Sequence, residues 1–230
     1  MAVILLSGGL DSALNLALAA REGKAATALT MRYGQRAEAP ELTAAQALAR
    51  HYGVRWRDVD MQWLGAVNPT SLTRGEQALP NLEIHELDKM ELATPSMRAV
   101  WVANRNGVFL NIAAAFAEAL GENEVMVGFN KEEAATFPDN SQSYIEAVNH
   151  ALSFSTLNGV KVSSYTTQWD KSRILATAIE IGLPLNLVWS CYEAGPERCW
   201  KCESCRRSER ALLAAGSAGK EWLGKMGRKV

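Results

Sequence analysis

Residues 2–12, which read Ala-Val-Ile-Leu-Leu-Ser-Gly-Gly-Leu-Asp-Ser, decide the fold of this chain. The apolar run at 2–6 is typical of a buried parallel strand, and apolar residues at helical spacing over 11–21 predict a helix directly after it. Paired glycines let the backbone approach a ligand closely. A helix N-terminus offers unpaired N–H groups and a positive dipole end to an anion. The stretch therefore predicts a phosphate-binding loop at the carboxyl end of a first strand.

Within this loop, Ser7 and Ser12 supply hydroxyl donors, and Asp11 can orient the loop or a magnesium ion. The loop has neither the glycine spacing of a dinucleotide fingerprint nor the GK[ST] ending of a Walker A loop. A turn that only connects strand to helix is the alternative interpretation, and the complete hexapeptide at 7–12 disfavours it. The nucleotide-binding residues that we predict in and beside this loop are Leu6, Ser7, Gly8, Gly9, Leu10, Asp11 and Ser12.

Strand and helix patterns alternate along most of the remaining chain. We predict strands at 25–31, 55–60, 124–127 and 160–164, and helices at 41–52, 104–120, 144–154 and 171–181. This alternation indicates an α/β fold with a mainly parallel sheet. Between 61 and 98 the pattern dissolves among prolines and glycines, and we expect an excursion over one edge of the sheet. The Gly-, Ala- and Lys-rich end after Ala214 predicts a frayed tail.

The composition is that of an ordinary soluble protein with a hydrophobic core. The chain has 230 residues, of which 48% are hydrophobic, and a formal net charge of -1. There is no basic excess of the kind that proteins coating nucleic acid usually show. The apolar run at 2–6 is too short for a signal peptide or a membrane span. We therefore expect a cytoplasmic protein that binds neither nucleic acid nor membrane, and in that compartment disulfides are rare.

All four cysteines of the chain fall in one pattern, Cys191-x7-Cys199-x2-Cys202-x2-Cys205. Thiolates at this spacing can close a tetrahedral shell around Zn²⁺, and four protein ligands suit a structural site without an open position. A redox-active dithiol and an iron–sulfur cluster are the alternatives. We favour one structural zinc ion per chain.

The hexapeptide SGGLDS at 7–12 resembles the PP-loop of the N-type ATP pyrophosphatases, which split ATP into AMP and pyrophosphate. With the C-terminal cysteines, nearly the whole chain is similar to the 7-cyano-7-deazaguanine synthase family. Further segments that carry the resemblance are Tyr33-Gly34-Gln35-Arg36, Arg105-Asn106, Phe137-Pro138-Asp139 and Lys171. The resemblance implies a doubly wound, adenine nucleotide alpha hydrolase-like domain at 1–188 that includes the excursion. It also implies a zinc-binding helical segment at 189–230.

The sequence departs from the family pattern at three places. Ala37 replaces a common histidine, Ala103-Asn104 replaces Pro-Gly, and Asn140-Ser141 replaces Cys-Arg. These changes concern the acid substrate and leave the ATP chemistry in place.

The family's activity implies an ATP-dependent ligase that converts 7-carboxy-7-deazaguanine and ammonia to 7-cyano-7-deazaguanine, a queuosine precursor. The resemblance implies catalytic roles for Asp11, Lys171, Arg105 and Asp139 and a nucleotide-binding role for Arg36, with Mg-ATP as a substrate. It also implies a homodimer and small-molecule partners only. Four aromatic residues are candidates for stacking on a heteroaromatic ring: Trp101, Phe129, Phe137 and Trp189.

Three other functions fit parts of the sequence. One is a related PP-loop ligase that stops at an amide or conjugates a deazaguanine acid. Another is a tRNA-thiolating PP-loop enzyme, although such enzymes usually add a cysteine pair near the loop or an RNA-binding module. The last is a regulatory module that binds nucleotide without turnover, which Asp11 and Lys171 disfavour.

Overall fold

The computed structural model describes residues 1–73 and 76–228, and its centre is a five-stranded parallel sheet. All four pairs of neighbouring strands are parallel, in the order β3-β2-β1-β4-β5. The strands are β1 (Ala2–Leu5), β2 (Ala25–Arg32), β3 (Arg55–Asp60), β4 (Glu124–Met126) and β5 (Lys161–Ser163). The chain adds strands first on one side of β1 and then on the other. This leaves a topological switch point between β1 and β4, where open α/β sheets bind ligands.

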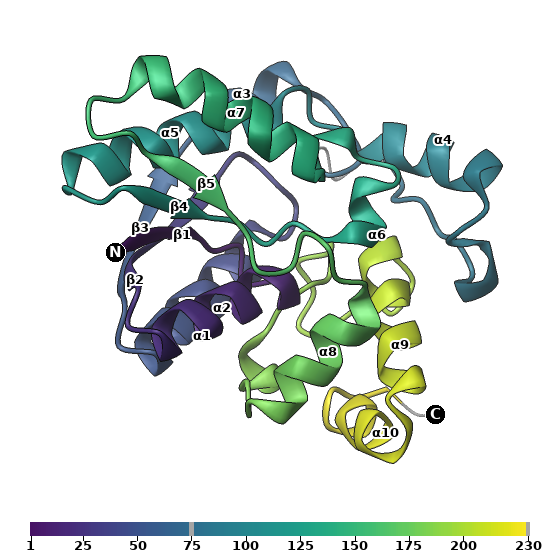
Figure 1. Cartoon of the computed structure of the whole chain (residues 1–230). Coiled ribbons are helices and arrows are strands. Elements are labelled where there is room, and N and C mark those ends of the chain that lie inside the picture. Colours follow the sequence, from purple (N-terminus) through teal and green to yellow (C-terminus); the bar gives the residue numbers. More distant parts are fainter. Residues whose placement is uncertain (74–75, 229–230) are drawn as a thin grey trace.

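Helices cover both faces of the sheet, as a doubly wound fold requires (Figure 1). One face carries α1 (Leu10–Arg21), α2 (Glu38–His51) and α8 (Lys171–Glu180), and the other carries α5 (Arg105–Ala119) and α7 (Gln142–Ser155). Successive residues of β1 point to opposite faces. The face with α1, α2 and α8 forms a first hydrophobic core, and the face with α5 and α7 forms a second. Ile4 accordingly packs in the first core and Val3 in the second. The predicted strands and helices are confirmed, with ends that differ by a few residues.

The excursion at 61–98 has more regular structure than its sequence pattern predicts. It contains α3 (Gln62–Val67), a 3₁₀ turn at Ile84–Glu86 labelled η1, and most of α4 (Met90–Val100). Pro95 lies inside α4, and a proline is normally a signal that a helix ends. The excursion leaves the edge strand β3 and reaches the carboxyl ends of the strands, where the Leu72 carbonyl accepts a 2.8 Å hydrogen bond from the Arg36 backbone.

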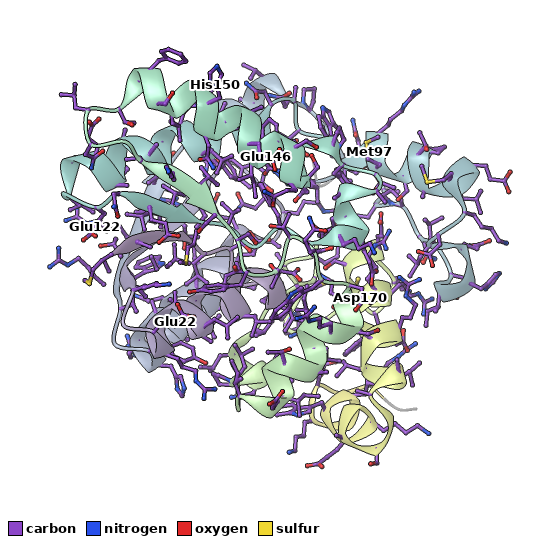
Figure 2. The ribbon with its side chains drawn as sticks, in the orientation of Figure 1. Glu22, Met97, Glu122, Glu146, His150 and Asp170 are labelled. Carbon is purple, nitrogen blue, oxygen red and sulfur yellow. The ribbon has the colours of Figure 1, made fainter. Side chains whose placement is uncertain are left out.

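Short elements shape the loops around the sheet's carboxyl edge. They are α6 (Lys131–Ala134) and the 3₁₀ turns η2 (Pro138–Asn140) and η3 (Leu185–Leu187). Asp170, which caps α8 by accepting from the Arg173 backbone N–H at 2.7 Å, marks the start of that helix in Figure 2.

The C-terminal segment folds back onto the first core through α9 (Glu203–Ala214) and α10 (Gly216–Lys225). The predicted frayed tail after Ala214 is therefore wrong. Leu223 of α10 is fully buried, and Trp222 packs against the same core. Two adjacent apolar residues thus anchor a stretch whose composition is otherwise typical of a tail. Within the described residues, no helix is both long and apolar enough to cross a membrane.

Candidate active site

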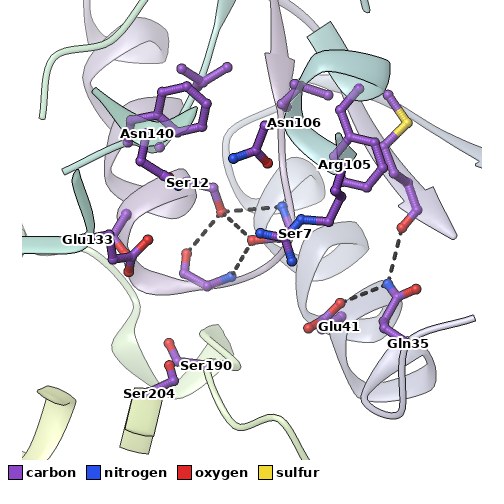
Figure 3. Close-up of a pocket in the computed structure, with 18 of the residues that line it drawn as sticks. Ser7, Ser12, Gln35, Glu41, Arg105, Asn106, Glu133, Asn140, Ser190 and Ser204 are labelled. Atoms are coloured by element: carbon purple, nitrogen blue, oxygen red, sulfur yellow. Dashed lines mark hydrogen bonds between the residues drawn. The ribbon is translucent and has the colours of Figure 1, made fainter. Parts of the chain in front are cut away.

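A cavity of about 250 Å³ opens at the carboxyl ends of the central strands (Figure 3). Its wall is built from the loop after β1, the ends of β2 and β4, the start of α5 and the C-terminal segment. Most of the predicted nucleotide-binding and catalytic residues line it: Leu6, Ser7, Gly9, Leu10, Asp11, Ser12, Arg36, Arg105 and Lys171. Gly8 and Asp139 lie outside the lining.

The loop at 7–12 is held in shape by its own hydroxyl groups. The Ser7 and Ser12 Oγ atoms lie 3.1 Å apart, and the Gly9 backbone N–H donates to Ser7 Oγ at 3.3 Å (Figure 3). Gly8 has a φ of +81°, and a Cβ there would lie 2.8 Å from Ala44 Cβ. Only glycine accommodates both that φ and that contact without strain. The sequence therefore fixes a loop whose backbone lies close against α2.

The loop after β4 closes tightly on the first turn of α1. A Cβ at Gly128 would lie only 2.5 Å from the Ser12 backbone nitrogen. A glycine here therefore lets the two sides of the switch point approach each other. The N-terminal turn of α1 faces the cavity at this place, as an anion-binding helix terminus requires.

Lys171 is a buried cation of the site and lies beside two carboxylates. Its Nζ lies 2.5 Å from Asp11 Oδ2 and 3.5 Å from Glu133 Oε1. Although burial opposes it, the charges of Asp11 and Glu133 raise the pKa of Lys171, which stays protonated. Burial raises the pKa of Asp11, against the opposing charge of Lys171. Asp11 Oδ1 is buried and has no hydrogen-bond partner among the described residues.

The two predicted arginines differ in how free they are. Both Arg36 Nη2 contacts with the Glu193 carboxylate are 2.8 Å long, so this guanidinium is already paired. Arg105 Nη1 lies 3.4 Å from the Tyr33 hydroxyl and has no carboxylate within salt-bridge distance among the described residues. Arg105 is therefore the cation better placed to meet a ligand carboxylate (Figure 3).

The loop with Phe137 presents its aromatic ring and an amide to the cavity. Phe137 and Asn140 are lining residues, and the Asp139 carboxylate instead accepts from Asn140 Nδ2 at 3.2 Å. Of the four aromatic candidates, Phe129, Phe137 and Trp189 line the cavity. Trp101 lies behind, stacked on Phe137 with a centroid distance of 6.1 Å.

The four cysteine sulfurs converge as the sequence predicts. Their Sγ atoms all lie within 4.8 Å of one another, and those of Cys199 and Cys205 are 4.0 Å apart. A tetrahedral Zn²⁺ with Zn–S bonds of about 2.3 Å needs sulfurs about 3.8 Å apart. Backbone N–H groups point at the sulfurs, for example that of Cys202 toward Cys199 Sγ at 3.3 Å. The donor set thus fits a four-thiolate metal ion.

Several cavity residues were not predicted from the sequence. Glu133 faces Lys171, and Ser190 Oγ accepts from the Leu10 backbone N–H of the phosphate loop at 3.3 Å. The first turns of α9 also contribute Glu203, Ser204 and Arg207 to the lining. The spacing of the four cysteines predicts a metal site. It does not indicate that residues between and beside the cysteines line the cavity next to the phosphate loop.

Known proteins resemble this chain along most of its length. The family model described as "Queuosine biosynthesis protein QueC" matches residues 1–216. A relative from Desulforudis audaxviator, named 7-cyano-7-deazaguanine synthase, is 50% identical over 93% of this chain and 97% of its own length. A relative of the same name from Methanosarcina mazei is 44% identical over 94% of each.

One solved structure supports the fold at low sequence identity. The U34-tRNA thiolase NcsA from Methanococcus maripaludis, solved with its [4Fe-4S] cluster, superposes with a TM-score of 0.51 at 16% identity. The match covers 97% of this chain and 70% of that chain. At this identity the likeness concerns the fold alone.

Proposed function

Because this chain belongs to the QueC family of queuosine biosynthesis proteins, we propose that it is an ATP-dependent ligase that forms 7-cyano-7-deazaguanine from 7-carboxy-7-deazaguanine and ammonia. The observation that carries the proposal is the contact between Lys171 and Asp11 beside a glycine-rich loop at the switch point of the sheet. That arrangement places a fixed cation where phosphate groups of a nucleotide meet a helix N-terminus.

The phosphates of ATP lie on the loop at 7–12 in this proposal. Backbone N–H groups of residues 8–12, the hydroxyls of Ser7 and Ser12, and the Lys171 ammonium stabilise the charge that develops on the departing pyrophosphate. These groups are already fixed by mutual contacts, so little reorganisation is needed when the charge appears.

The Mg²⁺ of Mg-ATP fits beside the same loop. Asp11 Oδ1 is buried and finds no hydrogen-bond partner in the part of the chain that the structure describes, and Glu133 presents a second carboxylate to the cavity. Hard oxygen ligands of this kind suit Mg²⁺, which would neutralise phosphate charge. We therefore propose Asp11 and Glu133 as the carboxylates that face the ion, in preference to Asp139.

The chemistry proceeds in two stages at one site. The substrate carboxylate attacks the α-phosphorus, which gives an acyl-adenylate and pyrophosphate, and ammonia then displaces AMP to form the amide. The amide oxygen is adenylated by a second ATP, and loss of AMP and protons leaves the nitrile. Arg105 holds the substrate carboxylate, because Arg36 is engaged by Glu193. Phe137 and Trp189 border the space for the heteroaromatic ring.

Product analysis tests this function. The purified protein is incubated with Mg-ATP, ammonium and 7-carboxy-7-deazaguanine, and products are identified by mass spectrometry. We expect the nitrile, with two AMP and two pyrophosphate for each molecule formed. AMP and pyrophosphate with an amide as the final product would instead assign the chain to a related ligase. Absence of AMP formation would leave only nucleotide binding.

We also propose that the four-cysteine site holds one structural zinc ion. A closed thiolate shell next to α9 stabilises a segment with a small core of its own. Elemental analysis of the purified protein is expected to give one zinc per chain, and visible absorption with bound iron would show a cluster instead. The homodimer, the cytoplasmic location and the domain division at 188/189 stay predictions, and light scattering checks the first of them.

A further inference from the structure

Two arginines of α9 contact one glutamate of α6, Glu132. Arg210 Nη2 lies 2.7 Å from Glu132 Oε2, and Arg207 Nη1 lies 3.3 Å from the same oxygen. The helix that carries both arginines begins between Cys202 and Cys205, so the cysteine cluster fixes its first turn. Glu132 thereby connects the metal-bearing segment to α6.

The second oxygen of Glu132 holds the start of α8. The Lys171 backbone N–H donates to Glu132 Oε1 at 2.8 Å. Lys171 is the first residue of α8, and an amide at that position has no partner inside its own helix. The same lysine directs its Nζ to Asp11 of the phosphate loop at 2.5 Å. A continuous series of contacts thus runs from α9 through Glu132 and Lys171 to the phosphate loop.

Lys171 needs such support on electrostatic grounds. A cation at the N-terminus of a helix is disfavoured by the helix dipole, and a carboxylate there is favoured. Besides the capping Asp170, Glu132 supplies a second carboxylate at this helix terminus, and it is itself held by two guanidinium groups. Its neighbour Glu133 lines the cavity, whereas Glu132 lies outside the lining. Any effect of Glu132 on the reaction must therefore pass through other residues.

We propose that Glu132 is a positioning residue, which ties α9 to the first amide of α8 and so fixes the Lys171 ammonium against the phosphate loop. The inference rests on the proposed function for the role of Lys171, although the contact itself does not depend on it. The C-terminal segment with the four cysteines then helps to position Lys171 at the phosphate loop, in addition to forming part of the cavity wall. Misplacing a charged group by about an ångström can cost as much as 100-fold in rate.

The test compares Glu132→Ala with Glu209→Ala. Glu209 is a matched control because two arginines also contact it, Arg206 at 3.3 Å and Arg228 at 2.8 Å, and it lies outside the cavity lining. In protein labelled with ¹⁵N-lysine, the NMR signal of the Lys171 amide is identified as the one that is missing in the Lys171→Arg variant. We expect Glu132→Ala to speed exchange of this amide about tenfold and to lower kcat about tenfold, with the KM for ammonium unchanged. Glu209→Ala should change neither.

Two further variants keep the test decisive if Glu132→Ala folds poorly. Glu132→Gln retains one oxygen for the Lys171 amide and loses the carboxylate oxygen that accepts from Arg210, so protection and kcat are expected to lie between those of wild type and Glu132→Ala. Arg210→Met removes the 2.7 Å contact between α9 and Glu132. As a single substitution it should speed exchange of the Lys171 amide. The same substitution should add little in Glu132→Ala, because both act through one contact series.

The outcomes separate this inference from the proposed function. If Glu132→Ala and Glu209→Ala show the same Lys171 amide exchange and the same kcat, the positioning role is overturned. If the wild-type protein forms no nitrile, the proposed function is wrong. The amide-exchange comparison needs no substrate and still decides the role of Glu132 in that case.

Discussion

At the scale of single residues, Gly8 is the position in the phosphate loop where a side chain meets the closest contacts. Its φ of +81° is combined with an approach of 2.8 Å to Ala44 Cβ and 2.9 Å to the Glu41 carbonyl. We expect Gly8→Ala to lower the free energy of unfolding by about 1–3 kcal/mol, because α2 must move away from the loop. At Gly9 the closest contact of an added Cβ is 3.3 Å, to Ser7 Oγ. Gly9→Ala is therefore the control. An equal loss of unfolding free energy in the two variants, measured by urea denaturation, would show that the close contacts of Gly8 do not matter for stability.

Glu41 makes the protein's stability depend on pH. It lines the cavity, where Gln35 Nε2 donates to it at 2.9 Å, and burial raises its pKa to about 7 from an ordinary value of 4.5. The neutral form is thus favoured in the folded state. Its stabilising contribution is fully present below pH 4.5 and is lost as the pH rises through about 7.

A glutamine at this position removes that dependence and retains the hydrogen-bond acceptor. Relative to wild type, Glu41→Gln should gain about 1–3 kcal/mol in free energy of unfolding between pH 5 and pH 8. Chemical denaturation at both pH values measures the difference. Parallel changes in the two proteins would show that Glu41 does not titrate in this range.

The sequence predicts those site residues that belong to a compact motif. Asp11 lies within the glycine-rich loop, and the cysteines converge because C-x-x-C turns bring their sulfurs together. Glu133 and Ser190 carry no comparable signal, since their positions depend on how two distant loops return to the sheet edge. The freedom of Arg105 and the engagement of Arg36 by Glu193 likewise follow from tertiary contacts alone.

At the scale of elements, α10 makes a contribution that its composition conceals. Leu223 is fully buried against α9 and the first core, whereas Leu157 after α7 is fully exposed. We expect Leu223→Ala to cost about 2–5 kcal/mol of stability, since it leaves a cavity in a packed interface. Leu157→Ala should change stability by less than about 0.5 kcal/mol. Thermal denaturation of both variants measures this, and a similar Tm for the two would restore the idea of a frayed tail.

The elements that the sequence predicts well are those with a long apolar pattern, such as α1 and the buried strands β1 and β2. The helices α3 and α4 escape prediction for physical reasons. The first has only six residues, and the second contains Pro95, beside which Ser96 Oγ donates to Glu203 Oε2 of α9 at 3.0 Å. Their place at the carboxyl ends of the strands depends on contacts such as that between Arg36 and Leu72.

At the scale of the whole molecule, residues from both ends of the chain form one wall of the cavity. The loop at 7–12 contacts Trp189 and Ser190 through hydrogen bonds of 2.8 and 3.3 Å, and α9 adds Ser204 and Arg207 to the lining. A nucleotide bound on the loop therefore meets the C-terminal segment as well. Ligand binding should stabilise the two ends of the chain together.

Hydrogen exchange with Mg-ATP checks this coupling. At 100 times its Kd, a ligand that binds only the folded state adds about 2.7 kcal/mol of stability. We expect slower exchange in peptides over 7–12 and also over 203–207, with little change near the exposed Phe154 at the end of α7. The protection at 203–207 should fall when the proposed zinc ion is removed with a chelator, because the cysteines beside the first turn of α9 then lose their common ligand. Protection confined to 7–12 in the metal-loaded protein would mean that the C-terminal segment does not contact the bound nucleotide.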